Sequence, residues 1–317
     1  MKRILVIRFS ALGDVAMTVP VVRALAEDYP DTEITMLSQQ RMADLFADMP
    51  KNVHFHGVDL KRQSLRAIAD ELGRFDAVAD LHGVWRSMYI RLRMRMKGAQ
   101  VAVIDKGRRD KWLLTHGFIH RQLTPTTERY RKVFEQLYLP VTDRERTGIA
   151  PETNRRGWGI APFAAHEGKV YPLEKMERVV EMLSQQGEPV VLFGGGKSEQ
   201  DILERWAAKY PNVESVAGRK TLGEELELIR TLRVMISMDS ANMHLASLAG
   251  TRVVSVWGAT HPYAGFLGYG QSEQDCVQRD LKCRPCSIYG NKKCKYGDYR
   301  CMAISPDEIV KKLKIEN

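Results

Sequence analysis

Residues 234–262, VMISMDSANMHLASLAGTRVVSVWGATHP, decide the fold of this chain. An apolar strand ends at Asp239, and a helix over 241–249 follows it and stops at Gly250. The chain then returns through a β-branched strand over 252–257. This order predicts a βαβ unit. The first helical N–H groups have no partner within the helix, so they favour an anion.

Three polar side chains lie at the mouth of this unit. Ser240 can donate to a phosphate, and His244, one turn further on, shares its face of the helix. Asp239 would repel phosphate, so we expect it to cap the helix and orient its neighbours. An ordinary capped helix with a core histidine has the same pattern, and this segment by itself leaves both interpretations open.

The N-terminus holds a second strand-to-helix passage. Residues 3–9 form a nearly all-apolar strand, and Gly13-Asp14 marks a tight turn into a helix. In an open α/β sheet, ligands bind outside the carboxyl ends of the strands, where Asp14 lies. Asp14 is therefore either a helix cap or a catalytic base. Pro20 should kink the helix or begin its regular part.

Together these segments resemble the heptosyltransferases of glycosyltransferase family 9, which transfer heptose from ADP-heptose to the inner core of lipopolysaccharide. The resemblance runs from Ile4 to about Ile309. The matching segments are RFSALGDV at 8–15, DLHGVWRS at 80–87, KVYP at 169–172 and MDSANMHLASLAG at 238–250. The family usually has glycine where this chain has Ala241. The added methyl group would shift or narrow the nucleotide site.

The resemblance implies a role for each matched residue. Asp14 is expected to be the general base of a single, inverting displacement, with Ser10 and Arg86 binding the acceptor. Lys169 is expected to contact the donor phosphates. Glu199 follows the glycines of FGGG, which let a nucleotide approach the backbone, and is expected to hold the ribose. The expected donor-binding set is Lys169, Glu199, Asp239, Ser240, Ala241 and His244.

The alternation of strands and helices predicts two Rossmann-like α/β domains, over 1–150 and 151–317, each with a parallel sheet. The expected strands lie near 3–9, 33–38, 53–57, 76–81 and 100–104, and then near 157–162, 189–194, 213–217, 234–238 and 252–257. The linker is expected within 139–156 and a closing helix from Ser305. The resemblance implies a GT-B architecture, with the sheets facing across a cleft, the acceptor bound by the first domain and the sugar nucleotide by the second.

Positive charge is concentrated in the first half of the chain. Net charge is +9, and residues 1–150 hold 25 lysine and arginine residues against 18 aspartate and glutamate. The alternating run Arg91–Lys97 precedes a better strand, so we interpret it as a helix. It is either a solvated face or a surface for an acidic glycolipid at a membrane. No zinc-finger, RRM or basic-zipper pattern accompanies it, so nucleic acid is not an expected partner.

Several other classes of protein lose support. No run of about 18 apolar residues and no signal-peptide pattern is present, so we expect a cytoplasmic protein, with at most peripheral contact to the inner membrane. GGGKS at 194–198 is not a Walker A motif, because Val191 occupies the place of its first glycine. Neither half opens with G-x-G-x-x-G, so NAD is not expected. No cofactor and no catalytic metal are predicted, since no D-x-D pair lies in a matched donor loop.

All five cysteines follow residue 275, and four of them form CxxC-x7-C-x6-C. These four are Cys283, Cys286, Cys294 and Cys301. A structural zinc site is one interpretation, but the wide second pair weakens it, and we favour reduced thiols that pack a loop. Three alternatives to heptose transfer stay open: another sugar nucleotide as donor, an inactive binding protein and, more weakly, a sugar-nucleotide epimerase.

Overall fold

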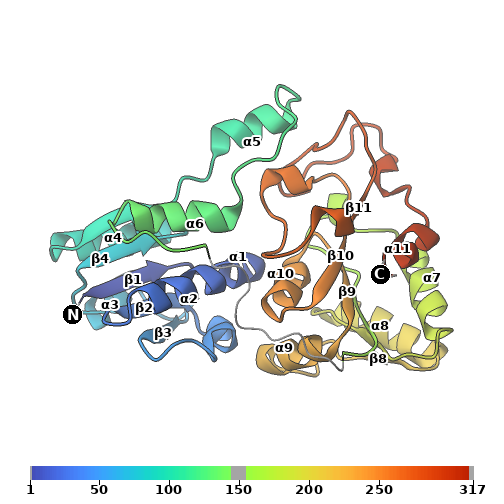
Figure 1. The fold of residues 1–317 in the computed structure, drawn as a ribbon, viewed down its shortest axis with the longest axis horizontal. Coiled ribbons are helices and arrows are strands. Elements are labelled where there is room, and N and C mark those ends of the chain that lie inside the picture. Colours follow the sequence, from blue (N-terminus) through green and yellow to red (C-terminus); the bar gives the residue numbers. More distant parts are fainter. Residues whose placement is uncertain (1, 144–154, 314–317) are drawn as a thin grey trace. The chain divides into compact units, whose positions relative to one another are not determined.

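The computed structural model describes residues 2–143 and 155–313, which form two compact units. The first comprises Met1–Lys106 and Pro125–Glu145, and the second comprises Gly107–Thr124 and Arg146–Asn317. Each is a parallel sheet between helices (Figure 1). This confirms the predicted pair of α/β domains with parallel sheets.

The first unit has a five-stranded parallel sheet in the order β3-β2-β1-β4-β5. Its strands are β1 (Arg3–Ile7), β2 (Glu33–Gln39), β3 (Val53–Val58), β4 (Ala77–Asp80) and β5 (Gln100–Val103). The helices are α1 (Leu12–Ala16), α2 (Val19–Asp28), a 3₁₀ helix (Gln40–Phe46), α3 (Leu65–Glu71), α4 (Trp85–Met96) and α6 (Thr126–Glu135). Right-handed crossovers place α3 and α4, which pack together, on one face, and α2 and α6 on the other.

The second unit has a six-stranded parallel sheet in the order β11-β10-β9-β6-β7-β8. Its strands are β6 (Trp158–Ala161), β7 (Val190–Leu192), β8 (Val213–Ser215), β9 (Val234–Met238), β10 (Arg252–Trp257) and β11 (Cys276–Gln278). The helices are α5 (Arg108–Thr115), α7 (Leu173–Ser184), α8 (Lys197–Lys209), α9 (Leu222–Thr231), α10 (Ala241–Leu248) and α11 (Pro306–Leu313). Short 3₁₀ helices lie at Glu167–Lys169, Pro262–Ala264, Glu273–Asp275 and Arg300–Met302.

Several local features that the sequence predicted are present in the structure. Pro20 lies in the first turn of α2, where its missing N–H costs nothing. The basic run is helical in α4, as interpreted. Gly250 ends the α10 segment with φ of +74°, a conformation that a side chain would strain. Ser305 caps α11, because Glu308 N–H donates to its Oγ at 3.3 Å.

Two features of the fold were not predicted. The strand β11 is an edge strand of three residues, too short for a period to identify. Residues 107–124 lie in the first half of the chain, yet they group with the second unit, where Leu114 and Leu123 pack against Ala264. Most of the expected linker, residues 144–154, lies outside the described residues.

Candidate functional site

The two sheets each have one point where the order of strands reverses, and polar residues gather at both. In the first sheet, Ile7 at the end of β1 pairs with Asp80 at the end of β4. In the second sheet, Ala161 at the end of β6 pairs with Ser237 near the end of β9. Ligands of open α/β sheets bind outside the carboxyl ends at such switch points. The predicted site residues follow these strand ends, except Glu199, which follows the neighbouring strand β7.

Asp14 lies in α1, beyond the end of β1, and half of its carboxylate is already held. Its Oδ2 is 2.6 Å from Nη2 of Arg8 and accepts a hydrogen bond of 3.2 Å from Ala11 N–H. The Asp14 side chain is 28% exposed. Within the described ranges no hydrogen bond or ion pair involves Oδ1. The carboxylate is therefore fixed through Oδ2, and Oδ1 is left to bind a ligand.

Arg8 is itself immobilised. It is 8% exposed, and its Nη1 donates to the carbonyl of Leu81 at 2.7 Å. Its guanidinium lies 5.9 Å from the ring centroid of Tyr130, whose hydroxyl donates to the main-chain carbonyl of Asp14 at 3.2 Å. The orientation of the Asp14 carboxylate is therefore set by a rigid, buried partner.

His82, after β4, faces the Asp14 loop. Phe9 N–H donates to its Nδ1 at 3.4 Å, which places the ring proton on Nε2. Burial, assisted by the positive charges of Arg8 and Lys106, lowers the pKa of His82 to about 4. At neutral pH this imidazole is therefore uncharged and can donate one hydrogen bond.

The loop that carries His82 is held by the buried carboxylate of Asp80. Its Oδ1 accepts the main-chain N–H groups of His82 and Gly83, at 3.0 and 2.8 Å. Its Oδ2 is 2.9 Å from Nη1 of Arg91 in α4. The structure thus uses one arginine of the basic run to neutralise a buried acid behind the loop.

The predicted acceptor residues are at the same edge of the first sheet. Ser10 is half-buried in the loop between β1 and α1. Arg86 is exposed in the first turn of α4, and its guanidinium lies 5.1 Å from the ring centroid of Trp85. Arg86 also acts electrostatically on His82. The structure brings Ser10, Asp14 and Arg86 to one edge without assigning what they bind.

In the second unit, Lys169 and Asp239 form an ion pair. Nζ of Lys169 is 2.9 Å from Oδ2 of Asp239, and their side chains are 16% and 5% exposed. Ser240 begins α10 with an extended backbone and no side-chain cap, because its Oγ lies 3.3 Å from Oγ of Ser237 instead. The prediction that Asp239 caps the helix is wrong, because tertiary pairing with Lys169 takes its carboxylate.

The first turn of α10 therefore keeps its backbone donors without a side-chain acceptor. Ala241 is half-buried at the first helical position, and His244 is buried one turn on. Glu199 lies in the first turn of α8, and its Oε2 accepts Gly195 N–H at 2.8 Å. Glu199 thus fixes the glycine loop after β7, a role that leaves one carboxylate oxygen for a ligand.

Two close contacts from later segments of the chain hold the Lys169 loop in place. Ala259 N–H donates to the carbonyl of Gly168 at 2.8 Å, and a Cβ added at Gly290 would lie 2.6 Å from Cγ of Lys169. Arg284, 4% exposed, donates from Nε to Gly258 carbonyl at 2.5 Å and from Nη2 to Thr260 carbonyl at 2.8 Å. The cysteine-rich segment thus supports the Lys169 loop through its backbone and one buried arginine.

The cysteines themselves are all free thiols. Burial raises the pKa of Cys286 to about 11 and also raises that of Cys301, whereas backbone N–H groups lower the pKa of Cys294. No three histidine, cysteine or acidic side chains converge to hold a metal ion in the ranges that the structure describes. The zinc interpretation, which the sequence ranked below reduced thiols, therefore gains no geometric support within these ranges.

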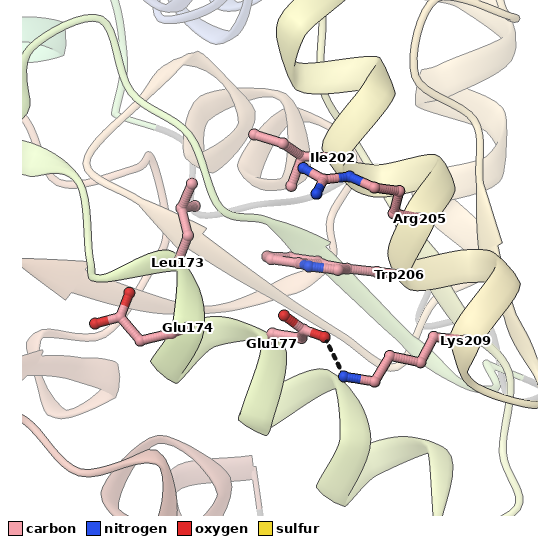
Figure 2. A pocket seen from close by; sticks show the side chains of 7 residues that line it. All are labelled: Leu173, Glu174, Glu177, Ile202, Arg205, Trp206 and Lys209. Carbon is pink, nitrogen blue, oxygen red and sulfur yellow. Dashed lines mark hydrogen bonds and ion pairs between the residues drawn. The ribbon is translucent and has the colours of Figure 1, made fainter.

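A cavity of about 370 Å³ lies elsewhere on the second unit, between α7 and α8 (Figure 2). Its walls include Trp206, Ile202 and Leu173, and Glu177 across it accepts a 2.7 Å hydrogen bond from Nζ of Lys209. That hydrogen bond lowers the pKa of Glu177. The cavity contains none of the predicted site residues, and two of its four charged side chains, Glu177 and Lys209, pair with each other.

Sequence reasoning missed Arg8, His82 and Arg284. The available signal for Arg8 was a charge at the end of an otherwise apolar strand, and for His82 a histidine within the DLHGVWRS match. Both lie in segments that had been singled out for other residues. Arg284 lies between Cys283 and Cys286, and only the cysteines of this segment were considered.

Comparisons with known proteins show which proteins share this fold and sequence. Lipopolysaccharide heptosyltransferase 1 of Pseudomonas aeruginosa is 26% identical, with 93% of this chain and 88% of that protein covered. The glycosyl transferase family 9 structure from Veillonella parvula has a TM-score of 0.75 at 20% identity, covering 98% and 95% of the two chains. Escherichia coli heptosyltransferase WaaC with ADP-2-deoxy-2-fluoro heptose has a TM-score of 0.68 at 18% identity, covering 91% and 97%. These two structures share its fold.

The sequence profile of glycosyltransferase family 9 matches residues 63–297, well over half of the chain. That range includes the DLHGVWRS loop, Lys169 and the complete α10 segment. The chain therefore belongs to glycosyltransferase family 9, the heptosyltransferase family.

Proposed function

We propose that this protein transfers heptose from ADP-heptose to the inner core of lipopolysaccharide, at the cytoplasmic face of the inner membrane. The observation that carries the proposal is the Lys169–Asp239 pair beside the uncapped start of α10. The names of its relatives and the ligand in the WaaC structure support this choice of donor and acceptor. Family membership supplies the class of reaction.

The donor diphosphate would bind at the switch point of the second sheet. Lys169 would supply the positive charge, and the first N–H groups of α10 and the Ser240 hydroxyl would supply hydrogen bonds. Asp239 would hold the lysine ammonium in place. The free oxygen of Glu199 would accept from the ribose hydroxyls, and Ala241 and His244 would border the diphosphate.

Asp14 would act as the general base in the first unit. Its Oδ1 would take the proton of the acceptor hydroxyl as that oxygen bonds to the anomeric carbon of the heptose. The bond from this carbon to the diphosphate would break in the same step, so the configuration inverts. Lys169 and α10 would stabilise the charge on departing ADP without a divalent metal, and we expect turnover to be unchanged in EDTA.

The acceptor is a phosphorylated glycan, which matches the cationic edge of the first sheet. Arg86 would contact its phosphate or acidic sugar groups. Ser10 would accept or donate a hydrogen bond beside Asp14. Neutral His82 would donate from Nε2, so its contribution would not vary with pH near neutrality.

Thermal stabilisation by nucleotides tests the donor half of this proposal. Ligands that bind only the native state raise the melting temperature by mass action. ADP, ADP-heptose, UDP, GDP, CMP and NAD would be compared at equal concentrations. Selective stabilisation by ADP and ADP-heptose is the expected result. A preference for UDP or GDP would overturn the donor, and a response to none would favour a protein that binds glycan alone.

A further inference from the structure

The helix α4 (Trp85–Met96) has an exposed apolar face. Trp85, Met88, Leu92 and Met96 are 64%, 44%, 46% and 80% exposed. Their spacings of three, four and four residues place them on one side of the helix. We call these four residues the apolar stripe. Side chains of this kind on one face of a helix mark an interaction surface.

The opposite face of α4 anchors the helix to its own unit. Ile90 and Met94 are fully buried in the hydrophobic core of the first unit. The helix is therefore apolar on two opposite sides. One side packs into the core of the first unit, and the four residues of the apolar stripe do not belong to that core.

Basic residues separate these two faces. Arg91 and Arg95 follow one border of the apolar stripe, and Arg86 and Arg93 follow the other. Arg91 and Arg93 pair with Asp80 and Asp70. Among the described residues, Arg86 and Arg95 have no carboxylate within ion-pair distance. The surface thus joins an apolar centre to uncompensated positive charge.

We infer that the apolar stripe of α4 docks on the surface of an anionic lipid bilayer, with the helix lying in the membrane plane. Apolar side chains would enter the boundary between headgroups and acyl chains, while the arginines contact lipid phosphates. At about 1.5 Å per residue, the 12 residues of α4 would contact the membrane over a length of about 18 Å. Within the described ranges, no helix is long and apolar enough to cross a membrane, so α4 would bind the surface.

The position of the stripe favours lipid over a protein partner. It begins at Trp85, whose ring contacts the Arg86 guanidinium, at the edge of the sheet that carries Asp14. This inference rests on the proposed function in one respect: an acceptor anchored in lipid would arrive at that edge from the membrane. The net positive charge of the first half of the chain is complementary to anionic headgroups.

Co-sedimentation with vesicles tests the docking without requiring activity. Wild-type protein would be mixed with phosphatidylcholine vesicles with and without phosphatidylglycerol. We expect binding to the anionic vesicles, weakened about 10-fold or more in L92S/M96S and about fivefold in Arg95→Gln. Tyr138→Ser is the matched control, because Tyr138 is 82% exposed in the same unit and outside the stripe. It should bind like the wild type.

Activity then separates this inference from the proposed function. L92S/M96S should transfer normally to a water-soluble acceptor fragment and lose transfer to acceptor embedded in vesicles. Equal binding of wild type to neutral and anionic vesicles, or equal loss in Tyr138→Ser, would overturn the docking. So would self-association through the stripe, or loss of transfer to the soluble fragment. If wild type transfers to neither acceptor, the proposed function fails, while the vesicle result still decides the docking.

Discussion

The switch points of the two sheets both hold an ion pair, but the pairs are built in opposite senses. In the first unit a buried cation, Arg8, fixes a carboxylate that is 28% exposed. In the second unit a buried carboxylate, Asp239, fixes the lysine beside it. The more exposed partner is an acid in one case and a base in the other. This difference matches our proposal, which needs a proton acceptor at the first site and a cation for the diphosphate at the second.

The two sites also differ in how far along the chain their supporting residues lie. The Asp14 carboxylate is held by Arg8 and Ala11, which are close to it in the sequence. The Lys169 loop is held by segments far along the chain, at Ala259 and Gly290. Changes in the cysteine-rich segment should therefore affect nucleotide binding and leave the base in place.

The largest effect should come from Asp14→Asn. The amide keeps the shape of the side chain but cannot accept a proton, so turnover should fall about 100-fold or more. ADP affinity, measured by titration calorimetry, should change less than about twofold. Asp31→Asn is the control, because Asp31 is an exposed acid of the same unit. Near-normal turnover in Asp14→Asn would remove this residue from the mechanism.

Lys169→Ala should act on binding first. Loss of a charge-assisted contact to a diphosphate should weaken ADP binding about 10- to 100-fold, and Asp239 would then stand unpaired near the anion. Calorimetry with ADP measures the effect, and Lys311→Ala, at an exposed lysine of α11, is the control. An unchanged ADP affinity would place the diphosphate elsewhere.

Protonation of His82 should make the free energy of unfolding depend on pH. The pKa of His82 is lowered to about 4 in the folded protein. Below about pH 6.5, therefore, the unfolded chain binds a proton at this histidine that the folded protein does not bind. Stability should fall between pH 6.5 and 4. After allowance for partial exposure, His82→Asn should remove about 1 kcal/mol of that fall. Urea unfolding at pH 7 and pH 4.5 checks this, and equal pH dependence in both proteins would contradict it.

Glu225, in the first turn of α9, should have an effect of similar size and opposite sign. Burial raises its pKa to about 7, so the unfolded chain loses this proton first and stability falls between pH 4.5 and 7. Glu225→Gln should therefore be more stable than wild type at pH 8, by about 1 kcal/mol after screening, and equal at pH 4. Equal stability at both pH values would show that Glu225 is solvated.

Much of this fold could be predicted, because its strands are buried on both faces and are continuous apolar runs. The α10 unit was found from local pattern, and so was the helical state of the basic run. Gly13-Asp14, expected as a tight turn before a helix, instead lie within α1. The pattern did not reveal that 107–124 belong to the second unit. That grouping depends on tertiary contacts, such as Leu123 N–H with the carbonyl of Tyr263.

The site shows the same division. Asp14, Lys169 and Ser240 were identified because motifs mark them, but their partners were not. Arg8 and the Lys169–Asp239 pair depend on which strands are neighbours, and a single sequence does not contain that order. Asp239 does not cap the helix for this reason, because the Lys169 ammonium, from the 3₁₀ helix after β6, pairs with its carboxylate instead.

Transfer from ADP-heptose tests the central claim most directly. Wild-type protein would be given ADP-heptose and a lipopolysaccharide acceptor without inner-core heptose, and the glycosylated product would be detected by mass spectrometry. We predict one added heptose for each ADP released, with little or no product from UDP- or GDP-sugars. No product from ADP-heptose, or faster transfer from another sugar nucleotide, would contradict the account.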